Sequence, residues 1–304
     1  MHRGREAAGE GFKSGFVSII GRPNVGKSTL LNALLNAKVA IVSPKPQTTR
    51  NRIRGVLTEA RGQIVFIDTP GIHKPRTVLG ERMVGSALGT LREVDAVLTV
   101  IDAEAGIQEA DRIVIAHIPK SLKRVYLILN KIDRIHPDRL LVLIDEARTL
   151  FDFAEYIPVS ATEGINVHAI RDVLFRDLPE GPPYYPPEMK SDHPETFLAQ
   201  EIIREKILHL TQEEVPHSVA VVVESWEEKP NVIVVRANIY VERDSQKGIL
   251  IGKGGRMLGE IGRKARLELE ALFGAKFYLE LWVKVKEDWR NRPGILQALG
   301  YREE

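Results

Sequence analysis

Hydrophobic residues in the first 180 positions gather into short, uninterrupted runs that alternate with helical patterns. Unbroken apolar runs are typical of strands buried on both faces, and their alternation with helices predicts a mostly parallel sheet covered by helices. Two neighbouring runs, 52–57 and 63–67, are joined by too few residues for a parallel crossover, so they predict an antiparallel pair. The runs that predict parallel strands are 16–20, 64–67, 96–101, 125–129 and 156–159.

The pattern changes at residues 179–187, where five of nine residues are proline. Such a composition predicts a stiff, extended linker between two domains. After it, the pattern predicts a helix at 196–210, strands at 218–224 and 232–241, a long helix at about 255–273 and a last strand at 276–285. The predicted organisation is a disordered tail at 1–14, a first domain at 15–178, a linker at 179–194 and a second domain with a C-terminal tail at 195–304.

Composition supports two globular domains and excludes several classes of protein. The 304 residues are 43% hydrophobic and 28% charged, which excludes a disordered or fibrous chain. The net charge is only +2, so a nucleic-acid surface would have to be a local patch. The absence of cysteine excludes disulfides and thiolate zinc sites. Neither a secretory signal nor an apolar run of membrane-spanning length is present, which predicts a cytoplasmic protein, attached to a membrane at most peripherally.

Residues 21–28 match the phosphate-loop pattern G-x-x-x-x-G-K-[ST] between a predicted strand and a predicted helix. Glycines allow successive backbone N–H groups to surround phosphates, and the helix N-terminus adds positive potential. Lys27 is expected to contact the β- and γ-phosphates, and the Ser28 hydroxyl to bind Mg²⁺. The predicted nucleotide-binding residues of this loop are Gly21, Arg22, Pro23, Asn24, Val25, Gly26, Lys27 and Ser28.

Three later motifs each follow a predicted strand and favour a guanine nucleotide. In Asp68-Thr69-Pro70-Gly71, the carboxylate can hold Mg²⁺ and the Gly71 N–H can approach the γ-phosphate. In Asn130-Lys131-Ile132-Asp133, the Asp133 carboxylate can accept two N–H bonds from guanine, which adenine does not offer. Ser160-Ala161 is expected to place a backbone N–H near the guanine O6. A nucleoside or nucleotide kinase is the alternative, and the Asn130–Asp133 motif argues against it.

On these motifs, residues 15–178 resemble an α/β P-loop GTPase domain of the translation-factor class. The resemblance implies that a threonine of the loop 43–50 binds Mg²⁺, and it favours Thr49 over Thr48. It also implies that Asn24 occupies the position of a K⁺ ligand; the alternative is that Asn24 only favours a tight turn. Ile72 replaces the glutamine that orients water in Ras-like proteins, and His73 is more readily explained as a bystander than as a base. The candidate catalytic residues are therefore Lys27, Thr49, Gly71 and Asn24.

In the second domain, Gly252-Lys253-Gly254-Gly255 matches G-x-x-G between two helical patterns. Six basic residues and one acidic residue between Lys247 and Arg266 give a local charge of +5; a solvated helix face is the alternative explanation. The order of helix, two strands, helix, G-x-x-G, helix and strand resembles a bacterial, type II KH domain of α+β class. The predicted RNA-binding residues are Ile251, Gly252, Lys253, Gly254, Gly255, Arg256 and Arg263.

A GTPase domain, a proline-rich linker and a KH domain together resemble the Era family of bacterial ribosome-assembly GTPases over residues 15–301. Residues 46–51 and the terminal Leu299-Gly300-Tyr301 agree with this resemblance. It implies binding of GTP or GDP, Mg²⁺ and K⁺, and hydrolysis of GTP as the only small-molecule substrate. It further implies binding to the 3′ end of 16S rRNA in the 30S subunit and partial association with the inner membrane. The alternative is an RNA-binding module in which the nucleotide is only a structural ligand.

Overall fold

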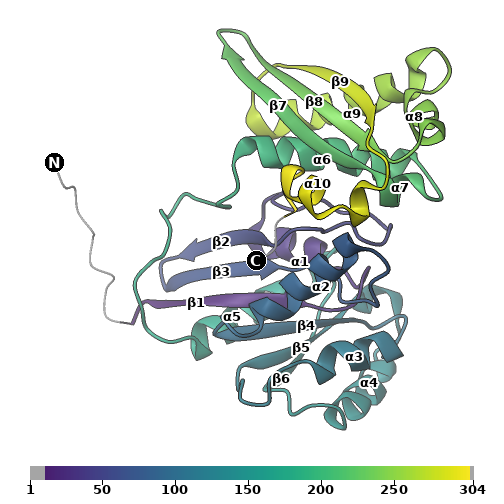
Figure 1. The fold of residues 1–304 in the computed structure, drawn as a ribbon. Helices are drawn as coiled ribbons and strands as arrows, with labels where there is room; N and C mark the ends of the chain where they lie inside the picture. The colour runs from purple at the N-terminus through teal and green to yellow at the C-terminus, as the bar shows by residue number, and fades with distance from the viewer. Residues whose placement is uncertain (1–10, 302–304) are drawn as a thin grey trace. The chain divides into compact units, whose positions relative to one another are not determined.

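The computed structural model describes residues 11–301, and the chain divides into two compact units (Figure 1). Unit 1 comprises the residues up to Ala40, Thr49–Lys74 and Met83–Asp192. Unit 2 comprises Ile41–Thr48, Pro75–Arg82 and the residues from His193 onward. Most of the predicted N-terminal tail and the last three residues lie outside the described part. The first strand begins at Lys13, three residues before the apolar run that predicted it.

Unit 1 contains a six-stranded sheet in the order β2-β3-β1-β4-β5-β6. β2 pairs with β3 in the antiparallel direction, and the other pairs are parallel. The predicted mostly parallel sheet with an antiparallel edge pair is therefore confirmed. The elements of this part are β1 (Lys13–Ile20), α1 (Lys27–Leu35), β2 (Ile53–Glu59), β3 (Gly62–Asp68), α2 (Val78–Thr90), β4 (Ala96–Asp102), α3 (Glu109–Ala116), β5 (Val125–Asn130), α4 (Asp138–Arg148), β6 (Glu155–Pro158) and α5 (Val167–Asp177). The first turn of α2, up to Arg82, belongs to unit 2.

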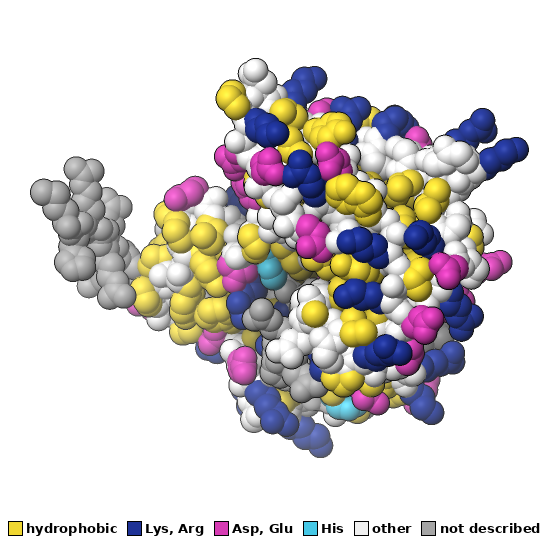
Figure 2. All heavy atoms as spheres, turned by 45° about the horizontal axis from the view of Figure 1, so that its top comes forward, with side chains coloured by type: hydrophobic (Ala, Val, Ile, Leu, Met, Phe, Trp, Pro, Cys, Tyr) yellow, Lys and Arg dark blue, Asp and Glu magenta, His cyan; other side chains and the backbone are white. Residues whose placement is uncertain are grey.

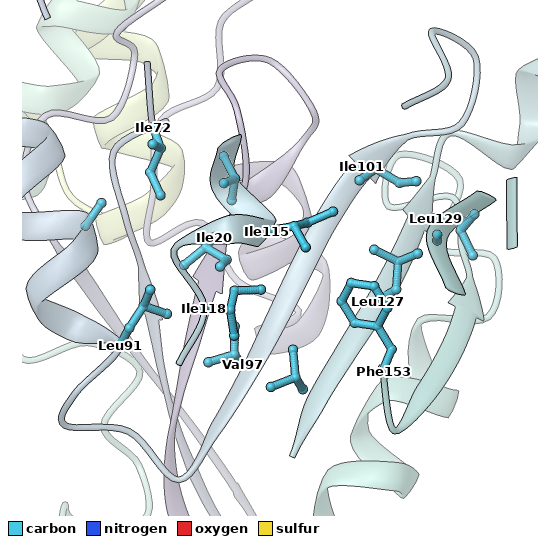
Figure 3. Packing of buried hydrophobic residues seen from close by; sticks show 14 of the residues in the cluster. Ile20, Ile72, Leu91, Val97, Ile101, Ile115, Ile118, Leu127, Leu129 and Phe153 are labelled. Atoms are coloured by element: carbon cyan, nitrogen blue, oxygen red, sulfur yellow. The ribbon is translucent and has the colours of Figure 1, made fainter. Parts of the chain in front are cut away.

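The apolar runs form strands because both faces of the sheet are covered. Every residue of β3, β4 and β5 is buried, as expected for a sheet with helices on both sides. On one face, α2, α3 and α4 contribute to a cluster that includes Ile20, Leu91, Ile115 and Leu127 (Figure 3). α1 packs against α5 and against β1, β2 and β3. Because parallel strands end at the same edge, this sheet brings the loops after β1, β3, β5 and β6 together.

The proline-rich segment lies along unit 1 as part of that unit. The Gln63 side chain accepts hydrogen bonds from the backbone N–H groups of Tyr184 (2.7 Å) and Tyr185 (2.9 Å). The Tyr184 ring lies 4.7 Å from the Phe16 ring. Val56 N–H donates to the Lys190 carbonyl at 2.9 Å. Proline lacks an N–H, so the non-proline residues of the segment make these hydrogen bonds. The segment therefore belongs to unit 1, and unit 2 resumes after Asp192, at His193.

Unit 2 contains a three-stranded sheet in the order β7-β8-β9, with β7 antiparallel and β9 parallel to β8. The helices pack on one face, and the core includes Ile203, Val235, Ile261 and Val283. This arrangement confirms the predicted KH fold. Ser218 ends a short helix instead of beginning a strand. The elements are α6 (Glu195–Leu210), α7 (Val215–Ser218), β7 (Ala220–Lys229), β8 (Val232–Val241), α8 (Asp244–Ile251), α9 (Arg256–Phe273), β9 (Phe277–Val285) and α10 (Pro293–Ala298). Within residues 11–301, no helix is both long enough and apolar enough to cross a membrane.

Candidate functional site

The phosphate loop joins β1 to α1, and its backbone folds tightly around the Lys27 side chain. The Lys27 ammonium donates to the Arg22 carbonyl at 2.8 Å, and the residue is 6% exposed. Gly26 has a φ of 101°, which side chains rarely adopt, and a Cβ there would overlap the Asn130 amide. The loop therefore has the closed shape that the glycine pattern predicts, with its lysine inside.

Burial lowers the pKa of Lys27 to about 8. The Asp68 carboxylate raises this pKa, the Arg22 guanidinium lowers it, and Asp111 raises it. Desolvation is the largest of these effects because an ammonium is more costly to bury than a neutral amine. A bound phosphate would hold Lys27 in its charged form, so binding above pH 8 requires uptake of a proton.

We expect GTP affinity to fall about fourfold between pH 7 and pH 8.5, because the protonated fraction of an amine with a pKa near 8 falls by that factor. The measurement is equilibrium binding of GTP at constant ionic strength. The Lys27→Arg variant, whose guanidinium stays charged, is expected to lack this component. The same pH profile in the parent and in Lys27→Arg would contradict the assignment.

The three residues predicted to hold Mg²⁺ lie together beside Lys27. The Ser28 hydroxyl donates to Asp68 Oδ2 at 2.6 Å and lies 2.8 Å from the Thr49 hydroxyl. Asp68 Oδ1 is buried and has no hydrogen-bond partner. Burial raises the pKa of Asp68 to about 6, although Lys27 and Ser28 lower it, so the carboxylate is largely ionised at pH 7. Two hydroxyls and a carboxylate with an unpaired oxygen form a donor set that fits Mg²⁺.

Thr48, the alternative to Thr49, makes a different contact. Its hydroxyl donates to the Lys45 carbonyl at 2.7 Å, within the loop itself. Of these two threonines, Thr49 is the one whose hydroxyl lies beside the Ser28 hydroxyl. The geometry therefore favours the same threonine as the family resemblance.

The Asp68–Gly71 motif brings the end of β3 against the phosphate loop. A Cβ on Gly71 would lie 2.7 Å from the backbone nitrogen of Pro23, so only glycine permits this approach. The next residue, Ile72, donates its N–H to the Gly21 carbonyl at 3.1 Å. Its side chain is 3% exposed and lies in the hydrophobic cluster with Ile20 (Figure 3). Ile72 therefore contributes packing and no group that could orient water.

The Asn130–Asp133 motif combines a structural brace with a partly exposed carboxylate. The buried Asn130 amide donates to the Val25 carbonyl at 2.9 Å and accepts from Ala161 N–H at 3.0 Å. It therefore connects the phosphate loop to the Ser160–Ala161 motif. Lys131 donates to the Asn24 carbonyl at 3.0 Å. Asp133 lies in a 3₁₀ turn, Ile132–Arg134; its side chain is 26% exposed, and its Oδ2 lies 3.8 Å from Arg134 Nε.

Two carboxylates that no motif indicated support this site. Asp102, at the end of β4, accepts a 2.6 Å bond from the Lys131 ammonium. Asp111, on α3, is 1% exposed and accepts a 3.1 Å bond from Arg22 Nε. Asp102 could be predicted at the site from the sequence, because it ends an apolar strand, as the residues of the other motifs do. The role of Asp111 could not be predicted from the sequence, because its partner, Arg22, is 89 residues away.

In unit 2, the G-x-x-G turn connects α8 to α9 through three glycines with positive φ. Gly252, Gly254 and Gly255 have φ values of 71°, 61° and 78°. A Cβ on Gly252 would lie 2.9 Å from the backbone nitrogen of Met257, whereas Gly254 and Gly255 face open space. Lys253 and Arg256 are exposed on either side of this open backbone. The turn is therefore accessible to a phosphate chain, as the motif predicts.

A groove of about 450 Å³ continues from the turn between α9 and β9. Arg263 and Arg266 line it, and both are paired: Arg263 with Glu260 at 2.9 Å and Arg266 with Glu270 at 3.2 Å. The local charge of +5 already includes Glu260, so the pairing with Glu270, beyond that window, is what neutralises part of it. Lys253 and Arg256 have no ion-pair partner within residues 11–301. The other lining residues are Gly255, Leu258, Gly259, Gly262, Tyr278, Leu279 and Leu281. Figure 2 shows basic and hydrophobic side chains interspersed on the face that it displays.

Comparison with known proteins gives the same two-part division. Residues 16–131 match the family model described as 50S ribosome-binding GTPase, and residues 214–290 match that of the KH domain. The solved structure of Era in complex with MgGDPNP and nucleotides 1506–1542 of 16S ribosomal RNA is 45% identical to this chain, with a TM-score of 0.92. The match covers 95% of this chain and 99% of that one. A single-substitution variant of Aquifex aeolicus Era, bound to GDP·AlF₄⁻, matches with the same identity, coverage and TM-score.

Proposed function

Because this chain belongs to the Era family of GTPases, we propose that it is a GTP-hydrolysing switch that binds the 3′ end of 16S rRNA and assists maturation of the small ribosomal subunit. The nucleotide chemistry belongs to residues 15–178 and the RNA binding to 195–304, joined by the segment 179–194. The observation that carries this proposal is the presence in one chain of a complete set of guanine-nucleotide motifs and an accessible G-x-x-G turn beside a groove.

Each group at the nucleotide site has a distinct task. Lys27 neutralises phosphate charge, and Ser28, Thr49 and Asp68 are the residues that would hold Mg²⁺, which supplies further charge stabilisation when bound. The Gly71 N–H is expected to donate toward the γ-phosphate. Hydrolysis consists of attack by water on the γ-phosphorus and departure of GDP, so stabilising the charge that develops there is the main requirement.

Because Ile72 cannot orient water, we propose that a K⁺ ion held by Asn24 supplies part of that stabilisation. The φ of Asn24 is 66°, a conformation that asparagine tolerates well and that also suits a plain turn. We expect hydrolysis to be faster in K⁺ than in Na⁺ at equal ionic strength, and Asn24→Ala to remove the difference. Equal rates of phosphate release in the two salts would leave Asn24 as a turn residue.

For the RNA site, we expect replacement of both Lys253 and Gly254 by aspartate to weaken RNA binding at least tenfold. The two carboxylates would repel phosphates, and the cation at the turn would be lost. The measurement is affinity for nucleotides 1506–1542 of 16S rRNA at several salt concentrations. GTP affinity serves as the control and is expected to stay unchanged. Unchanged RNA affinity would contradict the assignment of this turn.

The alternative, an RNA-binding module with a structural nucleotide, is kept open by the buried Ile72. A multiple-turnover assay of phosphate release, with and without small ribosomal subunits, separates the two functions. Sustained turnover supports the switch, and a single turnover followed by permanent retention of GDP supports the module. Peripheral association with the inner membrane remains a prediction from the family resemblance alone.

A further inference from the structure

β9 presents aromatic and basic side chains on the face of the sheet opposite the helices. Alternate residues of a strand point to opposite faces, and Phe277, Leu279, Leu281 and Val283 pack against the core on the helix side. The residues of β9 that alternate with these share the outer face: Tyr278, Glu280, Trp282 and Lys284. Lys276, which directly precedes β9, continues the row.

The two aromatic side chains of this row are unusually exposed to solvent. Tyr278 is 55% exposed and Trp282 is 46% exposed, although large aromatic side chains normally gain most from burial. They are four positions apart, which is about 13 Å along an extended strand. Their exposure on one face means that two ring surfaces are available to flat ligands.

The charges along β9 favour an anionic occupant at the outer edge of the sheet. Lys276 and Lys284 are exposed at the two ends of the row. The carboxylate between them, Glu280, is paired with Arg236 on β8 at 3.0 Å. Further from the edge, Glu224 on β7 accepts a 2.6 Å bond from Asn238. A phosphate chain would therefore be attracted along β9 and repelled from β7, the opposite edge of the sheet.

This row is continuous with the groove, because Tyr278 also lines the groove between α9 and β9. β9 is an edge strand, paired only with β8 in its sheet, so a chain leaving the groove can pass over it without obstruction from another strand. Successive bases stacked on aromatic side chains beside a basic track are a common way of holding single-stranded nucleic acid.

We propose that single-stranded RNA leaving the groove passes over β9 and stacks its bases on Tyr278 and Trp282. This inference rests on the proposed function, since the groove must first bind RNA. A KH groove holds about four nucleotides, so the outer face of β9 would extend the site beyond that length. Trp282 is then an affinity determinant for long RNA and has no contact with RNA confined to the groove.

The test compares nucleotides 1506–1542 of 16S rRNA with the tightest-binding tetranucleotide found by tiling that sequence. We expect Trp282→Ala to lower the affinity for the long RNA at least fivefold, which corresponds to one lost stacking contact. Its affinity for the tetranucleotide is expected to stay within twofold of that of the parent. Trp282→Phe keeps a stacking surface and is expected to bind both RNAs within twofold of the parent. Leu272→Ala, at another exposed hydrophobic residue (41%), is the matched control. Thermal unfolding checks that each variant is folded.

Tryptophan fluorescence gives an independent readout. Trp289 is fully buried, and Trp226 packs edge-on against two phenylalanine rings, so quenching by the long RNA should come largely from Trp282 and should be lost in Trp282→Phe. If Trp282→Ala binds the long RNA as the parent does, the proposal is wrong, and this face would then suit a protein partner. Equal weakening of both RNAs would also overturn it, because Trp282 would then act within the groove. Failure of the parent to bind either RNA would overturn the proposed function together with this inference.

Discussion

The Lys27→Ala variant is expected to lose GTP hydrolysis by at least 100-fold, the usual cost of removing a group that stabilises charge in the transition state. Lys27 is the cation enclosed by the phosphate loop, 2.8 Å from the Arg22 carbonyl. Burial disfavours the charged form of Lys27 in the parent, so removal of the ammonium should not lower the thermal unfolding midpoint. The measurement is phosphate release under saturating GTP and Mg²⁺.

Lys123→Ala provides the matched control for this prediction. Lys123 is exposed and lies between α3 and β5, outside every nucleotide motif. We expect that variant to hydrolyse GTP as the parent does. Turnover by Lys27→Ala within a few-fold of the parent, in a variant that is folded and binds nucleotide, would contradict the proposed mechanism.

The Asp133→Asn variant is expected to bind GTP more weakly by about 2–4 kcal/mol, or roughly 30- to 900-fold. The carboxylate can accept two N–H bonds from guanine, and the amide presents one acceptor and one donor. Xanthine carries an acceptor where guanine carries its amino group, so the variant should gain affinity for XTP. Competition binding of GTP and XTP measures both effects.

The control for base recognition is Asp138→Asn. Asp138 is a nearby carboxylate at the start of α4 whose side chain is 89% exposed, and it is outside the guanine motif. Its replacement should leave the preference for GTP over XTP unchanged. Parent-like binding of GTP by Asp133→Asn would remove the guanine assignment and reopen the kinase alternative.

Features encoded locally were predictable from the sequence, and those that depend on distant partners were not. The buried strands and the phosphate loop follow from apolar runs and glycine spacing, and the comparisons agree with the family that those motifs indicated. Asn130 was predicted at the nucleotide site, but its role as a brace depends on Val25 and Ala161, which lie far from it in sequence. The pairing of Asp111 with Arg22 likewise depends on how α3 packs.

Two further differences have the same physical origin. The proline-rich segment is predicted from its composition as a stiff, extended linker, yet its remaining N–H and carbonyl groups bond to Gln63 and Val56. The charge count around the G-x-x-G turn subtracts Glu260 but ends at Arg266, whereas helical spacing places Glu270 one turn further on, paired with Arg266. A count of charges in a window cannot distinguish a paired arginine from a free one.

In the proposed switch, the GTP-bound form of this chain holds the RNA, and hydrolysis releases it. This coupling is tested by the affinity of the full chain for nucleotides 1506–1542 of 16S rRNA, measured with saturating GDPNP and again with saturating GDP at the same salt concentration. We expect the GDPNP form to bind this RNA at least tenfold more tightly than the GDP form, because release follows hydrolysis. Equal affinity in the two states would contradict it, since hydrolysis could not then act as a release step.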